Sequence, residues 1–446
     1  MISRRQFVAG IIAGATAAGV LPMQAWAGES APAAKARAQE VDGPDKKGPA
    51  AESRTWNVGT PIVTYWAGPT MTDAVAAQMA DGGFNVVWCG EKDLDLVHRH
   101  RLRAQLTDRL LKPASLGNPT QREKLDALIA RVAKHPAMYC YFITDEPSAG
   151  AFASLGRLVT YLRERDPAHM AYINLFPTYA NNEQLGTKGD VVTAYREHLR
   201  QYVEVVRPAL ISYDHYQFAI NRDNDQYFLN LAMIRRAADD AQLPFLNIVQ
   251  ACTWAPTVMR VPKPDEMRYL VYTTAAYGAQ GISYYVYCCK DHVGGIALPD
   301  GTPTPIYHAL KSLSREFVAI ATQTQSLRWM AAYHTGMTPT GSVPLPADSV
   351  FRLDPPVAPI AGKPGERVRG ILLGLWGETA QQSAQVTPTH TLVVNMDYMA
   401  PVTTSLVGPG PLQAFDATEG KWLPAAGNRV HLHLPPGGGT LLRVAR

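Results

Sequence analysis

The stretch Tyr139-Cys-Tyr-Phe-Ile-Thr-Asp-Glu-Pro-Ser-Ala-Gly150 decides how this chain is interpreted, because an apolar run ends abruptly in two carboxylates and a proline. Short continuous apolar runs are typical of strands buried on both faces of a parallel sheet. Side chains alternate between the two faces of a strand. Asp145 and Glu146 can therefore point into the same cleft only if the chain turns between them, as Pro147 favours. We expect Glu146 to face a cleft and Asp145 to brace the loop or a neighbouring strand. A purely structural alternative is that Asp145 caps the next helix while Glu146 is solvated.

The pattern of a short apolar run followed by an amphipathic segment repeats along the chain. The apolar runs predict eight strands, at residues 62–66, 84–89, 102–106, 138–144, 170–176, 209–213, 245–251 and 281–287. Segments of helical period lie at residues 72–80, 121–134, 151–165, 191–206, 225–241 and 264–277, and a last long helix lies near 307–323. Eight such units over about 260 residues predict a closed (β/α)₈ TIM barrel. An open doubly wound sheet would carry a Gly-rich nucleotide loop, which the sequence lacks.

Residues 329–446 have a different character, with alternating apolar and polar side chains and frequent Pro and Gly. Val368-Arg-Gly-Ile-Leu-Leu-Gly-Leu-Trp376 and Val430-His-Leu-His-Leu434 are two of these runs. Alternation bounded by turn residues is typical of antiparallel strands. We therefore predict a catalytic barrel at 55–328, followed by a small C-terminal antiparallel β-sandwich at 329–446.

The first 54 residues are interpreted as two segments that precede the barrel. Ser3-Arg-Arg-Gln-Phe-Val8 resembles a twin-arginine export signal, and Ala25-Trp-Ala27 fits a small-residue cleavage site, so residues 1–27 are predicted to be a signal peptide. A membrane anchor is the alternative. Residues 28–54 have almost no large apolar side chains, which predicts a disordered linker. Together these features predict a bacterial protein that is periplasmic or secreted.

The overall composition excludes several classes of partner. The formal net charge is +4, and losing Arg4 and Arg5 with the leader would leave +2, so there is no basic excess for nucleic acid. No stretch after the leader approaches the roughly 20 apolar residues of a membrane helix. The five cysteines have no zinc-site spacing, and Cys140 is expected to be a buried small apolar residue. We predict no metal, no cofactor, no nucleic acid and no membrane contact once the leader is removed.

In a TIM barrel the functional residues lie at the carboxyl ends of the strands. Here these ends carry acids, amides and aromatic rings, which suits a carbohydrate because rings stack on sugar faces and polar groups bond to hydroxyls. Each aromatic residue has the alternative of being part of the wall or core, and His215 that of a structural residue. The predicted substrate-binding residues are Trp66, Trp88, Glu91, Asp145, Asn174, Tyr213, His215, Tyr216, Gln250, Trp254 and Tyr287.

Three segments carry a resemblance to a known family. They are Tyr141-Phe-Ile-Thr-Asp-Glu-Pro147, the run from Tyr161 to Pro167 that leads into Ala171-Tyr-Ile-Asn-Leu-Phe-Pro177, and Asp300-Gly-Thr-Pro-Thr-Pro-Ile-Tyr307. Over residues 58–325 the chain resembles bacterial glycoside hydrolases of the β-galactosidase-like (β/α)₈ barrel superfamily. That resemblance implies that Glu146, at the end of the fourth strand, is the general acid/base.

The chain departs from that family in two places. The family usually has Asn before the strand-four acid and a Glu nucleophile at the end of strand seven. Here Asp145 precedes the acid, and strand seven, Asn247-Ile-Val-Gln-Ala-Cys-Thr-Trp254, carries no carboxylate. We expect Asp214, at the end of the sixth strand, to be the second carboxylate, with the alternative that it only orients His215 or caps a turn. Glu91 and Asp291 are held in reserve for this role.

These features predict an exported glycoside hydrolase that cleaves an oligo- or polysaccharide with Glu146 and a second carboxylate, Asp214. A non-catalytic carbohydrate-binding protein on a degenerate TIM barrel is the alternative, because strand seven lacks its acid. A third interpretation is a cell-envelope interaction protein that uses the β domain. The sequence makes no prediction about the sugar, the linkage or the oligomeric state.

Overall fold

The computed structural model describes residues 61–378 and 387–445. The predicted signal peptide at 1–27 and the predicted linker at 28–54 lie outside these residues. Among the helices of the described segments, none combines the length and the apolar character needed to cross a bilayer.

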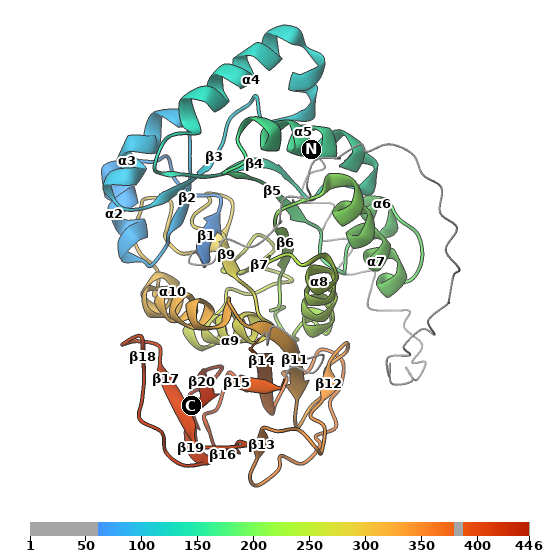
Figure 1. Cartoon of the computed structure of the whole chain (residues 1–446), viewed down its shortest axis with the longest axis vertical. Helices are drawn as coiled ribbons and strands as arrows, with labels where there is room; N and C mark the ends of the chain where they lie inside the picture. The colour runs from blue at the N-terminus through green and yellow to red at the C-terminus, as the bar shows by residue number, and fades with distance from the viewer. Residues whose placement is uncertain (1–60, 379–386, 446) are drawn as a thin grey trace, which may run out of the picture. The chain divides into compact units, whose positions relative to one another are not determined.

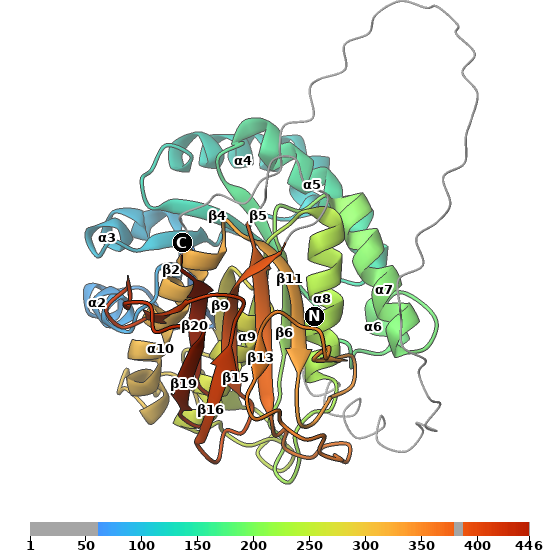
Figure 2. The same ribbon diagram turned by 60° about the horizontal axis from the view of Figure 1, so that its bottom comes forward.

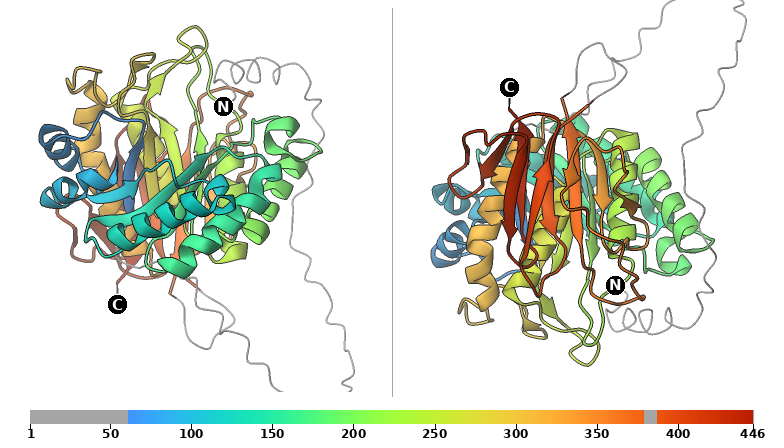
Figure 3. Two further views of the ribbon diagram at one scale, coloured as in Figure 1. Left: turned by 90° about the horizontal axis from the view of Figure 1, so that it is seen from above. Right: turned by 90° about the horizontal axis from the view of Figure 1, so that it is seen from below.

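Eight parallel strands form the first part of the fold (Figures 1 and 3). All eight were predicted, each within two residues of its observed bounds, so this prediction is confirmed. Along the sheet they follow the order β1-β9-β7-β6-β5-β4-β3-β2. The strands are β1 (Ile62–Trp66), β2 (Val86–Cys89), β3 (Arg103–Leu106), β4 (Met138–Asp145), β5 (Met170–Leu175), β6 (Ile211–His215), β7 (Phe245–Gln250) and β9 (Gly281–Tyr285).

Asn85 joins the two end strands of this order, β1 and β2. Its backbone N–H donates to the Val63 carbonyl at 3.1 Å, and its side-chain Oδ1 accepts from the Val63 N–H at 2.8 Å. Its Nδ2 donates to the carbonyl of Pro61 at 2.7 Å. One asparagine therefore satisfies backbone groups that a regular ladder would otherwise pair, which removes an open sheet edge. The predicted TIM barrel is confirmed.

Helices connect the strands and cover the outside of the barrel (Figure 1). Short helices such as α3 and α6 were not predicted, because one helical turn is too short to show a period. The predicted helix at 191–206 is observed as α7 followed by a π-helical segment at Tyr202–Val206. The helices are α2 (Asp73–Asp81), α3 (Leu94–Arg99), α4 (Pro119–Val132), α5 (Phe152–Arg165), α6 (Asn182–Leu185), α7 (Val191–Gln201), α8 (Tyr227–Ala241), α9 (Pro264–Ala276) and α10 (Pro305–Thr324).

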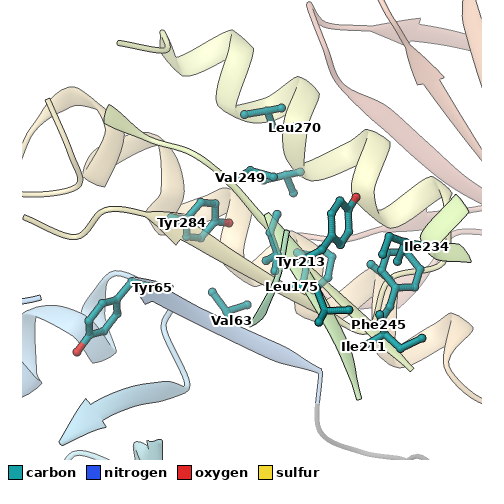
Figure 4. Packing of buried hydrophobic residues seen from close by; sticks show 14 of the residues in the cluster. Val63, Tyr65, Leu175, Ile211, Tyr213, Ile234, Phe245, Val249, Leu270 and Tyr284 are labelled. Carbon is teal, nitrogen blue, oxygen red and sulfur yellow. The ribbon is translucent and has the colours of Figure 1, made fainter. Parts of the chain in front are cut away.

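Alternation along the strands divides their side chains between the barrel interior and the layer under the helices. Figure 4 shows residues of the outer set together with Ile234 of α8 and Leu270 of α9, which belong to the same hydrophobic cluster. The inner set at the carboxyl ends includes polar side chains, with Asn174 beside Ser212 in the β5–β6 register. Successive residues of a strand belong to opposite sets. The register of each strand therefore decides which of its side chains point into the barrel at its carboxyl end. The outer set includes Val63, Tyr65, Leu175, Ile211, Tyr213, Phe245, Val249 and Tyr284.

The C-terminal part is a β-sandwich, as predicted. One sheet has the order β12-β11-β14-β15-β20-β17-β18 and the other β13-β16-β19, with antiparallel pairing except between β11 and β12. Leu353, Leu373 and Leu406 belong to the apolar layer between them. The strands are β11 (Arg328–His334), β12 (Val343–Pro344), β13 (Arg352–Leu353), β14 (Ile371–Gly377), β15 (Pro388–Asn395), β16 (Val402–Val407), β17 (Leu412–Asp416), β18 (Lys421–Trp422), β19 (Arg429–Leu434) and β20 (Gly439–Val444).

The sandwich packs directly on helix α9 of the barrel (Figure 2). Gly374 of β14 approaches this helix so closely that a Cβ there would collide with the carbonyl of Ala276. The indole N–H of Trp329 donates to the same carbonyl at 3.1 Å. Tyr277 Oη lies 3.0 Å from His334 Nε2 of β11. Backbone contact and buried polar pairs together join the two parts of the fold.

Candidate functional site

A polar row crosses the carboxyl ends of β4, β5 and β6. Asn174 Nδ2 donates to Asp145 Oδ1 at 3.1 Å and to Asp214 Oδ1 at 2.9 Å. Because both carboxylate oxygens bond to one nitrogen, they lie no more than about 6 Å apart. Asn174 Oδ1 accepts from Ser212 Oγ at 3.0 Å, and Ser212 Oγ lies 2.8 Å from Tyr172 Oη. With its oxygen bonded to a hydroxyl, the amide presents its NH₂ group to the two acids.

Glu146 follows this row in a left-handed backbone conformation, with φ of +45°. Its N–H donates to the carbonyl of Asn174 at 2.9 Å, so the turn is tied to β5. A non-glycine residue in this region stores about 1–3 kcal/mol of strain, which surrounding contacts must offset. The chain therefore does turn between the two acids, and Asp145 contacts the neighbouring strand as expected.

Tyr179, in the loop after β5, has a buried phenol whose pKa responds to the charges of both candidate catalytic carboxylates. Burial raises the pKa of its phenol well above the usual value, and the charges of Asp214 and Glu146 raise it further. Its Oη accepts a hydrogen bond from the N–H of Tyr216 at 3.2 Å, which leaves the O–H to donate. The phenol thus stays protonated. Tyr179 was not predicted from the sequence, because a loop residue has no periodic signal.

Two groups of aromatic rings lie on strands of the same barrel and on the loops after β6 and β7. The first wall is formed by Trp66, Trp88 and Phe142, with ring centroids 4.8 Å apart for the two tryptophans and 4.6 Å for Trp88 and Phe142. Phe142 was not predicted, although it lies three residues before Asp145 on the same strand. The three rings come from β1, β2 and β4.

The second wall is formed by Tyr216, Trp254 and Tyr285, whose ring centroids lie 4.9–5.2 Å apart. Tyr285 Oη lies 2.9 Å from His292 Nε2, which ties this wall to the loop after β9. Tyr285 and His292 were missed. The alternation of β9 could have identified Tyr285, because it lies on the opposite side of the strand from Tyr284.

Three predicted residues do not line the mouth as expected. Tyr213 and His215 flank Asp214 along β6, so alternation turns both away from the interior, and both are fully buried. His215 Nδ1 lies 3.1 Å from Asn230 Oδ1, and burial lowers the pKa of the imidazole to about 4. Tyr287 donates to Gln78 Oε1 of α2 at 2.7 Å. These three side chains support the barrel from outside.

Two further predicted residues have structural partners. Gln250, at the end of β7, is fully buried, and its Oε1 accepts from the Phe218 N–H at 2.8 Å while its Nε2 donates to the Arg260 carbonyl at 2.7 Å. It therefore joins the loops after β6 and β7. Glu91 forms two hydrogen bonds with Arg131 of α4, at 2.5 and 2.9 Å, which lower the pKa of the carboxyl. The reserve residue Asp291 is exposed in the loop after β9.

The described residues also bear on metal binding. Within residues 61–378 and 387–445, no three His, Cys, Asp or Glu side chains gather so that they could hold a metal ion. All five cysteines are free thiols, and Cys140 is buried, as expected. The chemistry that the site offers is therefore that of carboxylates, amides and aromatic rings.

Comparisons with known proteins show the fold. No family model matches the chain, and no curated protein matches it. Among solved structures, a β-galactosidase from Bacillus circulans sp. alkalophilus aligns with a TM-score of 0.52 and 9% identity, over 88% of this chain and all of that one. A GH27 β-L-arabinopyranosidase from Geobacillus stearothermophilus gives 0.45 and 10%, over 87% and 96% of the two chains. A β-galactosidase from the psychrophilic Marinomonas ef1 gives 0.43 and 12%, over 62% of this chain and 63% of that one, less than two thirds of its length. At such identities, what this chain shares with the Bacillus circulans structure is the fold.

Proposed function

We propose that this protein is a glycoside hydrolase whose catalytic carboxylates are Glu146 and Asp214. The observation that carries the proposal is the polar row of Asp145, Asn174 and Asp214, with Glu146 turned at the end of the same β4 strand. Asp145 and Asp214 come from separate strands and bond to the same asparagine, and the same barrel carries two groups of aromatic rings. The similarity in fold to a named β-galactosidase is consistent with this reading.

The two acids divide the chemistry of glycoside cleavage. Glu146 protonates the leaving oxygen, and Asp214 either attacks the anomeric carbon or activates water. Asp214 is 2% exposed and accepts from Asn174, so its position is tightly held. The neutral phenol of Tyr179, whose pKa the charges of both acids raise, offers an O–H donor for a carboxylate.

Asp145 is a second candidate partner for Asp214. Their bonded oxygens lie within about 6 Å, and retaining enzymes place their carboxyl groups about 5–5.5 Å apart. If Asp145 takes part in the chemistry, retention of the anomeric configuration is expected. The two assignments, Asp145 or Glu146 as the partner of Asp214, are separated by measuring the anomeric configuration of the product by NMR and by comparing the variants Asp145→Asn and Glu146→Gln.

A carbohydrate substrate is supported by the aromatic walls. A sugar ring has apolar C–H faces that stack on rings, and hydroxyls that bond to acids and amides. Trp88 and Trp254 are both partly exposed, one in each wall, and each offers such a surface. We propose that a saccharide lies between the walls with its scissile bond over the acids.

A non-catalytic carbohydrate-binding protein is the second candidate function. The observation that favours it is Gln250, which ends β7 and whose amide bonds only to backbone groups of two loops. A binder would retain its affinity for a glycan when Glu146 is replaced by Gln, whereas an enzyme would lose turnover.

The proposed hydrolase is tested by screening the mature protein against a panel of plant and bacterial polysaccharides and aryl glycosides. Glu146→Gln and Asp214→Asn should each reduce the rate by a factor on the order of 10³ or more on the active substrate. Glu164→Gln, an exposed acid on α5, is the matched control and should keep wild-type activity. Hydrolysis that survives both site variants would refute the assignment.

Export by the twin-arginine route also remains a proposal. It is supported by Arg4 and Arg5 and by the apolar segment that follows them. In a bacterial host, replacing both arginines by lysine should keep the precursor in the cytoplasm, and fractionation with immunoblotting measures this. Equal processing of the two forms would refute it.

A further inference from the structure

We propose that Tyr398 of the β domain is a positioning residue for the candidate site. Through Asp223 it holds the loop that follows β6, residues 216–226, which we call the β6 loop. This loop carries Tyr216 of the second aromatic wall. The kinetic part of the inference rests on the proposed function, whereas the structural part does not.

The contact between the β domain and the β6 loop is made at Asp223. Tyr398 Oη lies 3.0 Å from both carboxylate oxygens of Asp223. The backbone N–H of Asp223 donates to the carbonyl of Gly365 at 2.9 Å. Asp223 and Tyr398 are 5% and 6% exposed, so the contact is shielded from water. Both the side chain and the backbone of one loop residue are therefore bonded to the β domain.

Asp223 depends on these partners because it is a buried carboxylate. The nearest cation is Arg260, whose Nη2 lies 4.0 Å from Asp223 Oδ1, while its Nη1 bonds to Glu266 Oε2 at 2.5 Å. Arg260 is thus shared between two acids. A buried carboxylate has already lost its hydration, and the free-energy cost of that loss remains when a hydrogen-bond donor is removed. The Gln217 side chain also bonds to this carboxylate, so removing the Tyr398 hydroxyl should loosen the loop rather than detach it.

A short path leads from Asp223 to the site. Phe218 packs edge-on against the ring of Tyr398, with centroids 5.5 Å apart, and its N–H is held by Gln250. Ile220 donates to the Val258 carbonyl of the next loop at 3.0 Å. Tyr216 precedes Phe218 by two residues and contacts the Trp254 ring. A displacement of Asp223 would therefore be transmitted to the second wall through a few packed residues.

The acids are held by a different network. Asn174 and Ser212, on β5 and β6, position Asp145 and Asp214, whereas the β6 loop reaches this region through the Tyr216 N–H, which donates to Tyr179 Oη. Loosening this loop should disturb the binding of a sugar against Tyr216 more than the chemical step. The expected signature is a raised KM with little change in kcat.

The structural test is hydrogen exchange of the peptide that covers the β6 loop. Tyr398→Phe keeps the ring and removes only the hydroxyl, and exchange should become faster by a factor on the order of ten. The matched control is Tyr333→Phe on β11, which should leave exchange unchanged. Asp223→Asn, which keeps an oxygen acceptor for Tyr398, should protect the loop more than Asp223→Ala does. Unchanged exchange in Tyr398→Phe would overturn the proposal.

The kinetic test uses an aryl glycoside that the wild-type protein hydrolyses. Tyr398→Phe should raise KM about three- to tenfold and keep kcat within about twofold. Equal KM values would show that the contact is structural only, which also overturns the positioning role. If the wild-type protein hydrolyses no glycoside, the proposed function fails, and the exchange experiment still decides whether Tyr398 holds the loop. If Tyr398→Phe does not fold, Asp223→Ala tests the same contact from the loop side.

Discussion

The buried carboxyl of Asp223 gives a prediction about stability and pH. Burial raises its pKa from 3.8 to about 6, against the opposing effects of the Tyr398 hydrogen bond and the Arg260 charge. Because the folded protein binds this proton more tightly than the unfolded chain, Asp223 favours folding at low pH. Its destabilising effect appears as the pH rises from about 4 to 6.

The size of this effect follows from the shift. About two pKa units at 1.36 kcal/mol each give about 3 kcal/mol at neutral pH, of which about 1 kcal/mol is already present at pH 4.5. Asp223→Asn removes the titration and keeps an acceptor for Tyr398. The free energy of unfolding of the wild type, relative to the variant, should therefore fall by about 2 kcal/mol between pH 4.5 and pH 7.

Urea denaturation of both proteins at the two pH values measures this difference. Other titrating groups cancel, because they are present in both proteins. Arg260 and Glu266, which face Asp223, are unchanged as well. An equal difference in unfolding free energy at pH 4.5 and pH 7 would show that Asp223 is ionised in the folded protein at both, and would refute the reasoning.

Four other substitutions test the contacts that hold the fold and the site. Asn174→Ala removes two hydrogen bonds to carboxylates, so it should lower the free energy of unfolding by about 3 kcal/mol and reduce kcat. Ser212→Ala should lower the free energy of unfolding by about 1 kcal/mol. Urea titration measures the stability of each variant, and initial rates measure its activity. Asn85→Ala loses two side-chain bonds at the barrel closure and should cost about 2 kcal/mol in urea, a loss that an unchanged midpoint would contradict. Gly374→Ala places a Cβ against the carbonyl of Ala276 and should lower Tm at a cost of about 1–3 kcal/mol, so an unaltered melting curve would show that the two parts pack less tightly than described.

Some site residues were predicted correctly and others were not, because the sequence does not show directly which face of a strand each side chain occupies. Asp214 and Asn174 end strands that the sequence predicts, and the structure brings them together. Tyr213 and His215 were assigned to the same mouth, although alternation along β6 places them on the other side from Asp214. Tyr179 was missed because the direction of a loop side chain depends on what packs around it.

The sequence by itself determined the eight strands, most of the helices and the change to a β-sandwich. These depend on apolar runs and periods within ten or twenty neighbouring residues, which can be read locally. Only the tertiary structure decided that Asn85 closes the barrel, that Asn174 bonds two acids 69 residues apart along the chain, and that Tyr398 reaches Asp223. Such contacts join residues distant in the chain, and their geometry depends on strand stagger, barrel closure and domain packing, which no local pattern encodes.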